Sequence, residues 1–450
     1  MESKNKGTLG GIRDREVCIL GLCYVGLTLA VTMADIGFKV VGVEVLDDVV
    51  ESLSKGVPHF FEPGLESRLK RVIKYGNFLI KKKIPDKWNG SVYIITVGTP
   101  LDENKRVRLD MVKNVSSEVA SHIKEDDLVI MRSTLRLGTT RNIVLPILKR
   151  KCNKFDLAFC PERTLEGKAL IELRQLPQIV GGMSGQVSVR VSQLFQLITP
   201  TVVRVSDVET AEMIKLIDNT QRDVSFAYSN EVARACDAIG VSAIEVIRSG
   251  SLGYPRTNLP TPGPVGGPCL EKDSYILSEV LSEFGIKLEI SEAARKINER
   301  QPSESISFLR NIVEDPLSNM VITLMGIAFK GQPETDDLRG TMAKPIFSEL
   351  KKLFRNSTFR CYDAVVSKTD IINFGLEPVA DVADAFTNSD IVIILNNHKV
   401  FYDMDIESLS ATMKSNAIIY DFWNCFRSVE LHLSNNTKYV ALGSHKSISS

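Results

Sequence analysis

A short glycine-bearing turn near the start of the chain limits how the sequence can fold. The apolar run from Val17 to Leu22 predicts a strand, and the segment from Leu27 to Ile36 has the apolar pattern of a helix. A second strand-like run, from Phe38 to Glu44, follows almost at once. Strands and helices that alternate in this way are typical of an α/β protein with a parallel, doubly wound sheet.

The turn reads Gly21-Leu-Cys23-Tyr24-Val25-Gly26. Between a strand and a helix, a glycine-rich turn lets the pyrophosphate of a dinucleotide approach the N-terminus of the helix. Glu44 ends the next strand, where an acidic side chain accepts hydrogen bonds from the adenosine ribose and repels the extra phosphate of NADP. The pattern predicts that the turn and Glu44 bind NAD. The alternative is a tight strand–helix turn in another kind of α/β protein.

Cys23 departs from the dinucleotide-binding pattern, which has a glycine at this position. We expect its side chain to crowd the pyrophosphate. A Cys23→Gly variant is therefore predicted to bind NAD at least as tightly as the native chain.

The composition excludes several classes of protein. Lysine and arginine number 55, and aspartate and glutamate also number 55, so the formal net charge is zero. A neutral chain without a long basic run lacks the concentrated positive face that binds nucleic acids or membrane surfaces. The stretch from Val17 to Ala34 carries no charge, but glycines and threonines interrupt it. A buried strand, turn and helix are therefore favoured over a membrane or signal segment.

The cysteines and histidines indicate the compartment. Eight cysteines are scattered without a CxxC pair, and there are only five histidines. This usage argues against a zinc site or a disulfide framework, so that no metal is expected, and it fits the reducing cytoplasm.

A long helix is predicted in the middle of the chain. The segment from Ser206 to Ile239 contains neither proline nor glycine, Ser206 and Glu209 form a capping box, and Gly240 is placed to end the helix. A helix of about 33 residues would be on the order of 50 Å long, too long for a crossover within one sheet. We expect it to join two domains and to leave one apolar side free for a partner subunit.

Further strand-like runs lie on both sides of this helix: Val92–Val97, Leu128–Met131 and Ile179–Val180 before it, and 321–329, 359–363, Ile391–Leu395 and Ala417–Asp421 after it. A helical pattern from Met342 to Leu353 lies among the later runs. Residues 1–15 and 445–450 are expected to be loose ends. We predict a Rossmann domain over 1–205, a central helical domain over 206–315 and a second, smaller Rossmann-like domain over 316–450.

The loop Thr261-Pro-Gly-Pro-Val-Gly-Gly-Pro-Cys269-Leu-Glu-Lys-Asp273 is the sharpest local feature. Its adjacent glycines let another backbone or a ligand come close to the sulfur of Cys269. If a helix starts there, its N-terminus and Lys272 favour the thiolate form, and Asp273 lies one helical turn away. We expect a reactive thiol at Cys269, and small buried side chains at Cys18, Cys152, Cys160, Cys236 and Cys361.

Two weaker features lie outside this loop. Lys215 and Asn219 are four residues apart on the long helix, and Pro161-Glu162-Arg163 is a short polar motif. A solvated helix face and a surface turn are the ordinary explanations for such residues.

Taken together, the motifs resemble the nucleotide-sugar 6-dehydrogenase family, whose members oxidise UDP-glucose or UDP-N-acetylhexosamines. The matching motifs occur in the family order over nearly the whole chain: GLCYVGL, FEPGL at 61–65, VGTP at 97–100, RSTL at 132–135, PERTLEG at 161–167, AEMIKLIDNT at 211–220, NE at 230–231, PGPVGGPCLEKD at 262–273, and GIAFKG with DDLRGT at 326–341.

The resemblance implies a reaction and an architecture. The family oxidises the C6 alcohol of a UDP-sugar to a carboxylate in two successive NAD-dependent steps. It implies an NAD-binding N-terminal domain, a homodimer through the central helix, and a C-terminal domain that helps to hold UDP. Cys269 would attack the intermediate aldehyde and form a thiohemiacetal, which is oxidised to a thioester and then hydrolysed.

The resemblance also implies roles for individual residues. Lys215 would stabilise the oxyanion and Asn219 would place the sugar. Asp273 and Glu162 are candidate general bases, and Thr134 would lie at the nicotinamide and hold the hydrolytic water. Thr99 is expected to contact the cofactor, and Arg256 to reach the neighbouring subunit's site. The remaining residues expected to bind the substrate are Arg163, Gly266, Lys330 and Arg339.

Besides Cys23, one further departure from the family pattern lies in the cysteine loop, and other motifs bear on the substrate. The cysteine loop reads PGPVGG, one glycine shorter than the N-acetylhexosamine pattern PGPGVGG. PER followed by EG, and Tyr-Pro-Arg before the loop, resemble the N-acetylglucosamine and N-acetylmannosamine enzymes more than the PEFLxEG of the UDP-glucose enzymes. We therefore predict a UDP-N-acetylhexosamine substrate. The alternatives are UDP-glucose, a two-electron NAD dehydrogenase of similar layout, and a catalytically dead member of the family.

Overall fold

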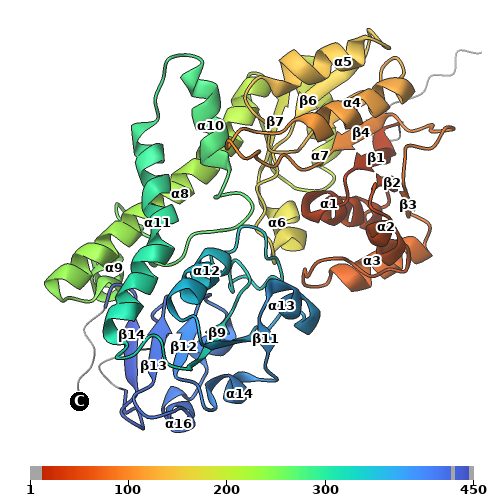
Figure 1. The fold of residues 1–450 in the computed structure, drawn as a ribbon. Helices are drawn as coiled ribbons and strands as arrows, with labels where there is room; N and C mark the ends of the chain where they lie inside the picture. Colours follow the sequence, from red (N-terminus) through yellow and green to blue (C-terminus); the bar gives the residue numbers. More distant parts are fainter. Residues whose placement is uncertain (1–12, 427–430, 445–450) are drawn as a thin grey trace, which may run out of the picture. The chain divides into compact units, whose positions relative to one another are not determined.

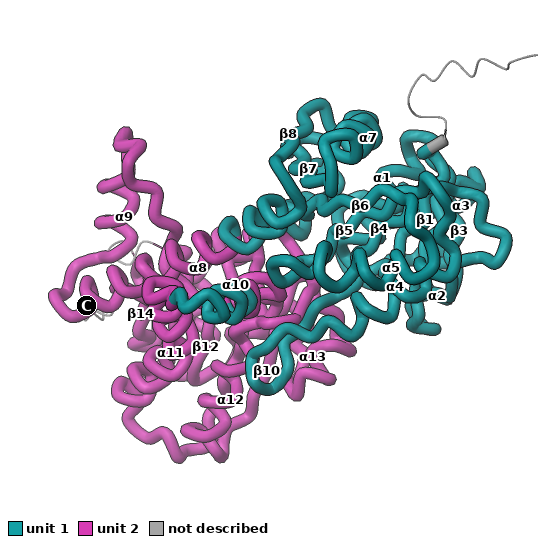
Figure 2. Tube along the Cα trace, turned by 90° about the horizontal axis from the view of Figure 1, so that it is seen from above, with its two compact units in different colours: residues 1–218, 275–286 teal, residues 219–274, 287–450 magenta. Residues whose placement is uncertain are grey.

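The computed structural model describes residues 13–426 and 431–444 and divides into two compact units (Figures 1 and 2). The first unit comprises the chain up to Asp218 together with Tyr275–Ile286, and the second comprises Asn219–Ser274 and the chain from Lys287 onward. The predicted central domain, 206–315, is thus shared between the two units. The division into three domains stays a prediction. The expected loose end at 445–450, and that at 1–12, lie outside the described residues.

An eight-stranded sheet forms the centre of the first unit (Figure 1). Its strand order is β3-β2-β1-β4-β5-β6-β7-β8, which is doubly wound around β1 as the alternating pattern predicts. The strands are β1 (Glu16–Leu20), β2 (Lys39–Val43), β3 (Phe78–Lys81), β4 (Val92–Ile95), β5 (Leu128–Met131), β6 (Asp156–Phe159), β7 (Gln178–Gly182) and β8 (Val202–Arg204).

One strand pair of this sheet departs from the parallel prediction. β7 runs antiparallel to β6, with Ala158 opposite Gly182 and Phe159 opposite Gly181. The segment between the two strands therefore starts and ends at the same edge of the sheet, where the parallel strands have their carboxyl ends. A parallel return would have to cross the full length of the sheet. The reversal keeps residues 160–177 at the edge where ligands bind in α/β sheets.

Helices cover both faces of this sheet and bury an apolar core on each. The helices that supply the first core are α1 (Tyr24–Asp35), α2 (Asp47–Ser54), α3 (Leu65–Lys74), α6 (Ala169–Gln175) and α7 (Gly185–Phe195). The second core receives side chains from α4 (Asp110–His122), the π-helical turn η2 (Thr140–Val144) and α5 (Leu145–Lys149). Alternate residues of β1 enter the two cores, because successive side chains of a strand point to opposite faces.

The beginning of the described chain is more ordered than predicted. Arg13–Arg15 form a 3-10 turn, η1, and the Asp14 carboxylate lies 2.7 Å from the Arg190 guanidinium and accepts a hydrogen bond from Ser91. This part of the expected loose end is therefore wrong, because an ion pair to α7 fixes it.

The second unit contains the second parallel sheet that the sequence predicts, with strand order β11-β10-β9-β12-β13-β14. Its strands are β9 (Val321–Met325), β10 (Thr358–Tyr362), β11 (Glu377–Pro378), β12 (Ile391–Ile394), β13 (Ile418–Asp421) and β14 (Lys438–Ala441). The predicted strand over 321–329 ends at Met325, because Gly326 takes a left-handed conformation with φ +81°. Its sheet helices are α12 (Ala343–Leu353), α13 (Lys368–Phe374), α14 (Val382–Phe386), α15 (Lys399–Tyr402) and α16 (Ile406–Ser410).

Four further helices lie between the two sheets in the sequence: α8 (Val208–Ile239), α9 (Ala243–Ser251), α10 (Asp273–Ser282) and α11 (Glu289–Ile312). The long helix and its end at Gly240, where φ is +75°, are confirmed. The predicted cap is wrong by one residue, because the Asp207 carboxylate accepts the backbone N–H of Thr210. Ser206 instead bonds the hydroxyl of Thr210. Among the residues that the structure describes, no helix combines the length and the apolar character of a membrane span.

Candidate functional site

The turn between β1 and α1 has the backbone that a pyrophosphate site needs. Gly21 lies in the left-handed region with φ +93°, which favours glycine. At Gly26 a Cβ atom would lie 1.8 Å from the carbonyl oxygen of Gly21, so that any side chain is excluded there. The first turn of α1 therefore packs directly on the preceding loop, and its backbone N–H groups stay accessible to an anion.

Cys23 occupies the N-cap position of α1 without strain, because its φ is −70°. Its side chain is half-buried, and its thiol lies 3.6 Å from the carbonyl oxygen of Thr96. The sulfur thus contacts the end of β4. The predicted crowding of a pyrophosphate by this side chain stays a prediction.

Glu44 lies at the carboxyl end of β2, next to the same turn. One oxygen of its carboxylate accepts the backbone N–H of Leu22 at 3.0 Å. The other accepts the backbone N–H groups of Val45 and Leu46, at 2.8 and 3.2 Å. These bonds fix an acidic group beside the turn, as the ribose contact of an NAD site requires.

Two predicted cofactor residues meet at the carboxyl ends of the next strands. The hydroxyl of Thr99, which follows β4, donates to the backbone carbonyl of Thr134 at 2.6 Å. Thr134 follows β5, so the hydrogen bond joins the VGTP and RSTL motifs at one edge of the sheet.

Glu162 is buried and paired with Arg132. Its carboxylate accepts a hydrogen bond from Nε of Arg132 at 3.0 Å and the backbone N–H groups of Arg163 and Thr164, both at 2.8 Å. Burial opposes ionisation, but the charge of Arg132 and these hydrogen bonds lower the pKa of Glu162, and Lys215 adds to the effect. Glu162 is therefore a carboxylate near neutral pH, and it is electrostatically coupled to Lys215.

Arg132 itself was missed in the sequence as a functional residue, although it opens the RSTL motif. It is 2% exposed and also donates to the Gln178 side chain at 2.7 Å and to the Cys160 carbonyl at 3.3 Å. The guanidinium of Arg163 donates to the carbonyl of Pro177 at 2.7 Å, so that this predicted substrate residue is tied to its own loop.

In the second unit, Cys269 stands in helical turns that run into α10. The backbone N–H of Asp273 donates to the carbonyl of Cys269 at 2.9 Å, as in a helix. The Cys269 side chain is half-buried, whereas Cys18, Cys152, Cys160, Cys236 and Cys361 are all buried, as predicted. Cys269 therefore lies at the start of helical turns and, unlike those five cysteines, is only partly buried.

Asp273 contacts the polar side chains near this thiol. Its side chain is fully buried, accepts a hydrogen bond from the Asn219 amide at 2.6 Å, and lies 3.0 Å from Nζ of Lys272. Burial alone would lower the pKa of Lys272, but the charge of Asp273 and the electrostatic interaction with Cys269 raise it. Lys272 is therefore a cation in this cluster, and its predicted effect on the thiol stays a prediction.

The two adjacent glycines bring a second backbone to the cysteine loop. At Gly266 a Cβ would lie 2.2 Å from the carbonyl oxygen of Gly340, and the backbone N–H of Gly267 donates to that oxygen at 2.8 Å. Gly340 follows Arg339, whose charge acts on Lys272. The DDLRGT motif therefore joins the cysteine loop. Arg339 is 58% exposed and forms an ion pair with Asp337, and Lys330 lies over the ring of Phe329.

A buried polar network, which the sequence did not predict, holds the cysteine loop. Asn230 of α8 both accepts from and donates to the backbone of Gly263, at 2.9 and 3.1 Å. Asn298 of α11 accepts from Asn230 at 3.1 Å and donates to Asp223 at 2.9 Å. Arg295 pairs with Asp223 at 3.3 Å. The NE motif at 230–231 was the one available signal.

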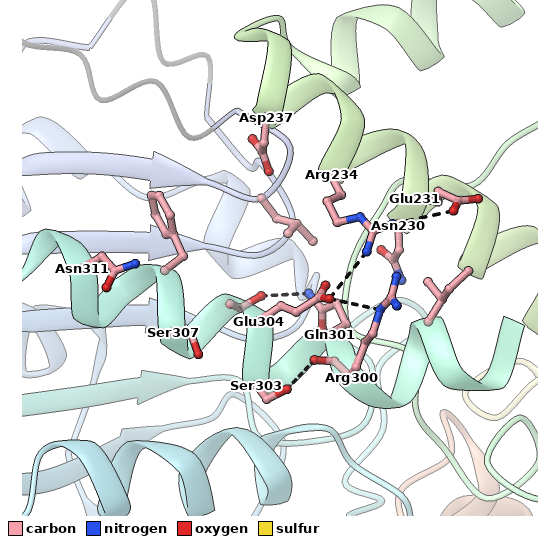
Figure 3. Close-up of a pocket in the computed structure, with 14 residues that line it drawn as sticks. Asn230, Glu231, Arg234, Asp237, Arg300, Gln301, Ser303, Glu304, Ser307 and Asn311 are labelled. Atoms are coloured by element: carbon pink, nitrogen blue, oxygen red, sulfur yellow. Dashed lines mark hydrogen bonds and ion pairs between the residues drawn. The ribbon is translucent and has the colours of Figure 1, made fainter. Parts of the chain in front are cut away.

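Arg256 does not join these clusters, and a cavity in the second unit shares only Asn230 with the polar network. Arg256 is exposed, and its guanidinium lies over the ring of Tyr254 in its own loop. A cavity of about 470 Å³ lies between α8 and α11 in the second unit, and Figure 3 shows Arg234 and Arg300 directed at Glu304 there. No predicted site residue lines this cavity.

The chain matches three models of the UDP-glucose/GDP-mannose dehydrogenase family in order. The NAD binding domain matches residues 15–199, the central domain residues 209–300 and the UDP binding domain residues 323–428.

Individual relatives are similar over most of their length. A UDP-N-acetyl-D-mannosamine dehydrogenase of Pyrococcus horikoshii is 32% identical over 415 residues, which are 90% of this chain and 94% of that protein. A protein of the same name from Yersinia pestis is 30% identical over 404 residues, 86% of this chain and 94% of that one. The solved structure of UDP-D-ManNAc dehydrogenase from Pyrococcus horikoshii has a TM-score of 0.85 at 29% identity, covering 96% of this chain and 99% of that one.

Proposed function

The chain belongs to the UDP-glucose/GDP-mannose dehydrogenase family and is an NAD-dependent UDP-sugar dehydrogenase, and we propose that it oxidises the C6 alcohol of a UDP-N-acetylhexosamine to the uronic acid. The names of the relatives favour UDP-N-acetylmannosamine over UDP-N-acetylglucosamine. The observation that carries the proposal is the cluster of Cys269, Lys272, Asp273 and Asn219, because a two-electron dehydrogenase has no use for a nucleophilic thiol.

The first unit fits the cofactor. A pyrophosphate can approach the backbone of α1 because Gly26 has no side chain, and Glu44 is fixed beside the turn for a ribose diol. NAD, when bound, accepts a hydride from C6 in each of the two oxidations. We propose that Gly21, Cys23, Tyr24, Val25, Gly26 and Glu44 hold it, together with Thr99 and Thr134.

Asp273 is the better of the two candidate bases for the C6 hydroxyl. The pKa of Glu162 is lowered by Arg132, so Glu162 is ionised and suits the role of a counter-ion to Lys215. Asp273 lies one helical turn from Cys269 and directs the Asn219 amide. We assign Asp273 to the proton of the alcohol, and Glu162 to the ionised partner of Lys215.

The thiol then supports the second oxidation. The Cys269 thiolate adds to the aldehyde carbon, a C–S bond forms, and the carbonyl electrons become an oxyanion that the Lys215 ammonium stabilises. Loss of the second hydride gives a thioester. Water adds to the thioester carbon, the C–S bond breaks, and the thiolate leaves with release of the carboxylate. Lys272 stabilises the thiolate both before it attacks the aldehyde and after it leaves the thioester.

Binding of the UDP-sugar is assigned to the remaining predicted residues. Lys330 and Arg339 offer cations to the pyrophosphate, and the backbone at Gly266 allows a close approach. Arg163 is assigned to the substrate, and Arg256 to the site of a neighbouring subunit. The exposed position of Arg256 supports that assignment.

We further propose a cytoplasmic homodimer that forms through α8. Large apolar side chains are exposed along α8 and the following segment, among them Tyr228, Ile239 and Leu252, the last 86% exposed. Exposed apolar surface of this kind is typical of a subunit interface. The free cysteines support a reducing compartment. Light scattering of the purified protein tests the dimer.

The experiment that tests the function is a substrate panel. The enzyme is incubated with NAD and UDP-N-acetylmannosamine, UDP-N-acetylglucosamine or UDP-glucose, and NADH is counted per UDP-sugar consumed. We expect two NADH per UDP-N-acetylmannosamine. One NADH per sugar supports a two-electron enzyme, and none with any sugar supports a dead family member.

A Cys269→Ser variant tests the covalent step. It is expected to lose most turnover and still bind the UDP-sugar, because the hydroxyl replaces the thiolate with little change in volume. Full four-electron activity of this variant would contradict the mechanism. Cys236→Ser, a buried cysteine in α8 far from the loop in sequence, serves as the matched control and should keep its activity.

A further inference from the structure

The FEPGL motif at 61–65 has no part in the proposed reaction, yet its acidic residue is buried. Glu62 is 6% exposed, and it stands just before Gly64, where φ is +78° and α3 begins. A buried carboxylate is costly unless several hydrogen-bond donors satisfy it. The donors that surround Glu62 therefore indicate what the motif does.

Three donors from two other segments satisfy this carboxylate. One oxygen of Glu62 accepts the hydroxyl of Tyr24 and the backbone N–H of Gly167, the latter at 2.7 Å. The other accepts the backbone N–H of Leu170 at 3.3 Å. The backbone nitrogen of Gly167 also lies 2.6 Å from the Tyr24 hydroxyl oxygen. Glu62, Tyr24 and Gly167 are thus each hydrogen-bonded to the other two.

These partners come from the two loops to which we assign different ligands. Tyr24 is the first residue of α1 and part of the NAD turn. Gly167 ends the PERTLEG loop, which carries Glu162 and Arg163. Glu62 belongs to neither loop and contacts both.

The geometry leaves little freedom in this contact. Tyr24 is 7% exposed, and its ring packs against Phe60 at a centroid distance of 4.8 Å. Burial, and then the Glu62 carboxylate, raise the pKa of Tyr24, so its hydroxyl remains a donor at neutral pH. Gly167 has φ +84°, which fixes the direction of its N–H.

We infer that Glu62 is a positioning residue that holds the cofactor turn and the substrate loop in one fixed relation within the first unit. The inference rests on the proposed function for the identity of the two ligands. Its consequence is that one side chain, which touches neither ligand in this assignment, controls the affinity for both.

The test compares binding of the two ligands by the native chain and by Glu62→Gln, each measured without turnover. NADH binding is followed by fluorescence, and UDP-N-acetylmannosamine binding by calorimetry in the absence of NAD. Glutamine keeps the size but replaces one acceptor oxygen by a donor. We expect both dissociation constants to rise about three- to tenfold, the range of one or two lost hydrogen bonds. Tyr24→Phe removes only a hydroxyl and provides a second variant if Glu62→Gln does not fold. Because Tyr24 is itself assigned to NAD, the informative result for this variant is weaker binding of the UDP-sugar, which we expect.

Glu172→Gln is the matched control. Glu172 accepts the backbone N–H of Leu165 at 2.7 Å and so holds the substrate loop without reaching the cofactor turn. It should weaken only UDP-sugar binding. If Glu62→Gln and Tyr24→Phe weaken one ligand alone, or neither, the inference is wrong while the proposed function stands. If the native chain binds NADH but no UDP-sugar, both are wrong.

Discussion

Two of the three key positions in the cofactor turn require glycine, and the third does not. Gly21 needs its left-handed φ of +93°, and Gly26 has no room for a Cβ atom. At the middle position, Cys23 has an ordinary φ of −70° and directs its thiol to the Thr96 carbonyl. The departure from the glycine pattern is therefore tolerated by the backbone.

Cys23→Gly is expected to lower the stability of the protein without weakening its binding of NADH. The variant gains backbone freedom in the unfolded chain and loses the contact with Thr96, so its free energy of unfolding should fall by about 1 kcal/mol. Its dissociation constant for NADH should be equal to or lower than that of the native protein. Fluorescence titration and urea unfolding measure the two quantities. A tenfold loss of NADH affinity would refute the crowding of the pyrophosphate by Cys23.

The first residues of η2 are attached to α8 through a buried carboxylate. Glu212 is fully buried and accepts the backbone N–H of Gly138 at 2.6 Å, and both the N–H and the hydroxyl of Thr140, at 2.9 and 2.6 Å. Burial raises the pKa of Glu212 to about 7, against the opposing effect of these hydrogen bonds. The attachment lies one helical turn from Lys215.

Glu212 should therefore make folding pH-dependent. Its folded-state pKa of about 7 lies above the ordinary value of 4.5, so the folded state holds the proton more tightly. The resulting stability is complete below pH 4.5 and is lost as the pH rises from there through 7, a loss of about 3 kcal/mol. Glu212→Gln should lack this part of the pH dependence. Urea unfolding in a Trp423→Phe background, where Trp88 reports on the first unit, measures it.

Glu209→Gln is the control for this measurement. Glu209 lies one turn earlier on α8 and pairs with Arg141 at 2.6 Å, and this pairing lowers its pKa. It is ionised in both folded and unfolded states above about pH 6, so its variant should keep the native pH dependence there, apart from a small fall in the pKa of Glu212, which the charge of Glu209 raises. An unchanged slope in Glu212→Gln would contradict the assignment.

The link between α8 and α11 should affect catalysis through the cysteine loop. Asn298 is fully buried and joins Asp223 to Asn230, which holds Gly263. In Asn298→Ala the buried Asp223 loses a donor, at a cost of about 2 kcal/mol in stability. We expect kcat to fall about tenfold with an unchanged KM for NAD, because about 1.4 kcal/mol of lost positioning corresponds to one factor of ten.

Gln301→Ala provides the comparison for Asn298→Ala. Gln301 is also buried on α11, but its amide donates to Ser305 of the same helix and not to the loop support. Its variant should keep the native kcat. Equal losses of kcat in both variants would mean that α11 acts only through general stability.

The sequence predicted the elements that follow a simple apolar pattern. All the named strand-like runs and the long helix are present, and Gly240 ends that helix. The reversal of β7 could not be read from the pattern, because a buried parallel strand and a buried antiparallel strand have the same apolar run. The cap also differed, since Ser206 and Asp207 are both good N-cap residues and only the backbone decides between them.

The candidate site was predictable where the chemistry requires a special residue or spacing. The glycines of the turn, Glu44, Cys269 and Asp273 have such signals. Asp223 and Asn298 lie on long helices that carry many other polar residues, and Arg132 is one of many arginines in the chain. Only their burial in the folded protein distinguishes these three residues. The role of Glu62 likewise depends on contacts with Tyr24 and Gly167, which lie far from it in the sequence.

The balance of 55 basic and 55 acidic side chains leaves the chain without a net field. In the proposed site, local cations such as Lys330 and Arg339 bind the anionic UDP-sugar without long-range steering. We expect kcat/KM for the UDP-sugar to fall less than about threefold between 20 and 200 mM NaCl, whereas steered enzymes lose on the order of tenfold or more. Potassium acetate in place of NaCl separates ionic strength from chloride competition. A steeper fall in both salts would contradict the expectation.

The antiparallel return from β6 to β7 lets the part of residues 160–177 that precedes α6 vary in length. Both ends of the segment lie at one edge of the sheet, so a longer or shorter version changes no strand register. Each doubling of its length costs only about 0.6 kcal/mol in closure entropy. Insertions before α6 can therefore change the proposed substrate loop while the sheet stays intact, provided that Glu162 and the two N–H groups that face Glu62 are kept. The length and sequence of this loop can therefore change more readily than those of the strands and helices around it.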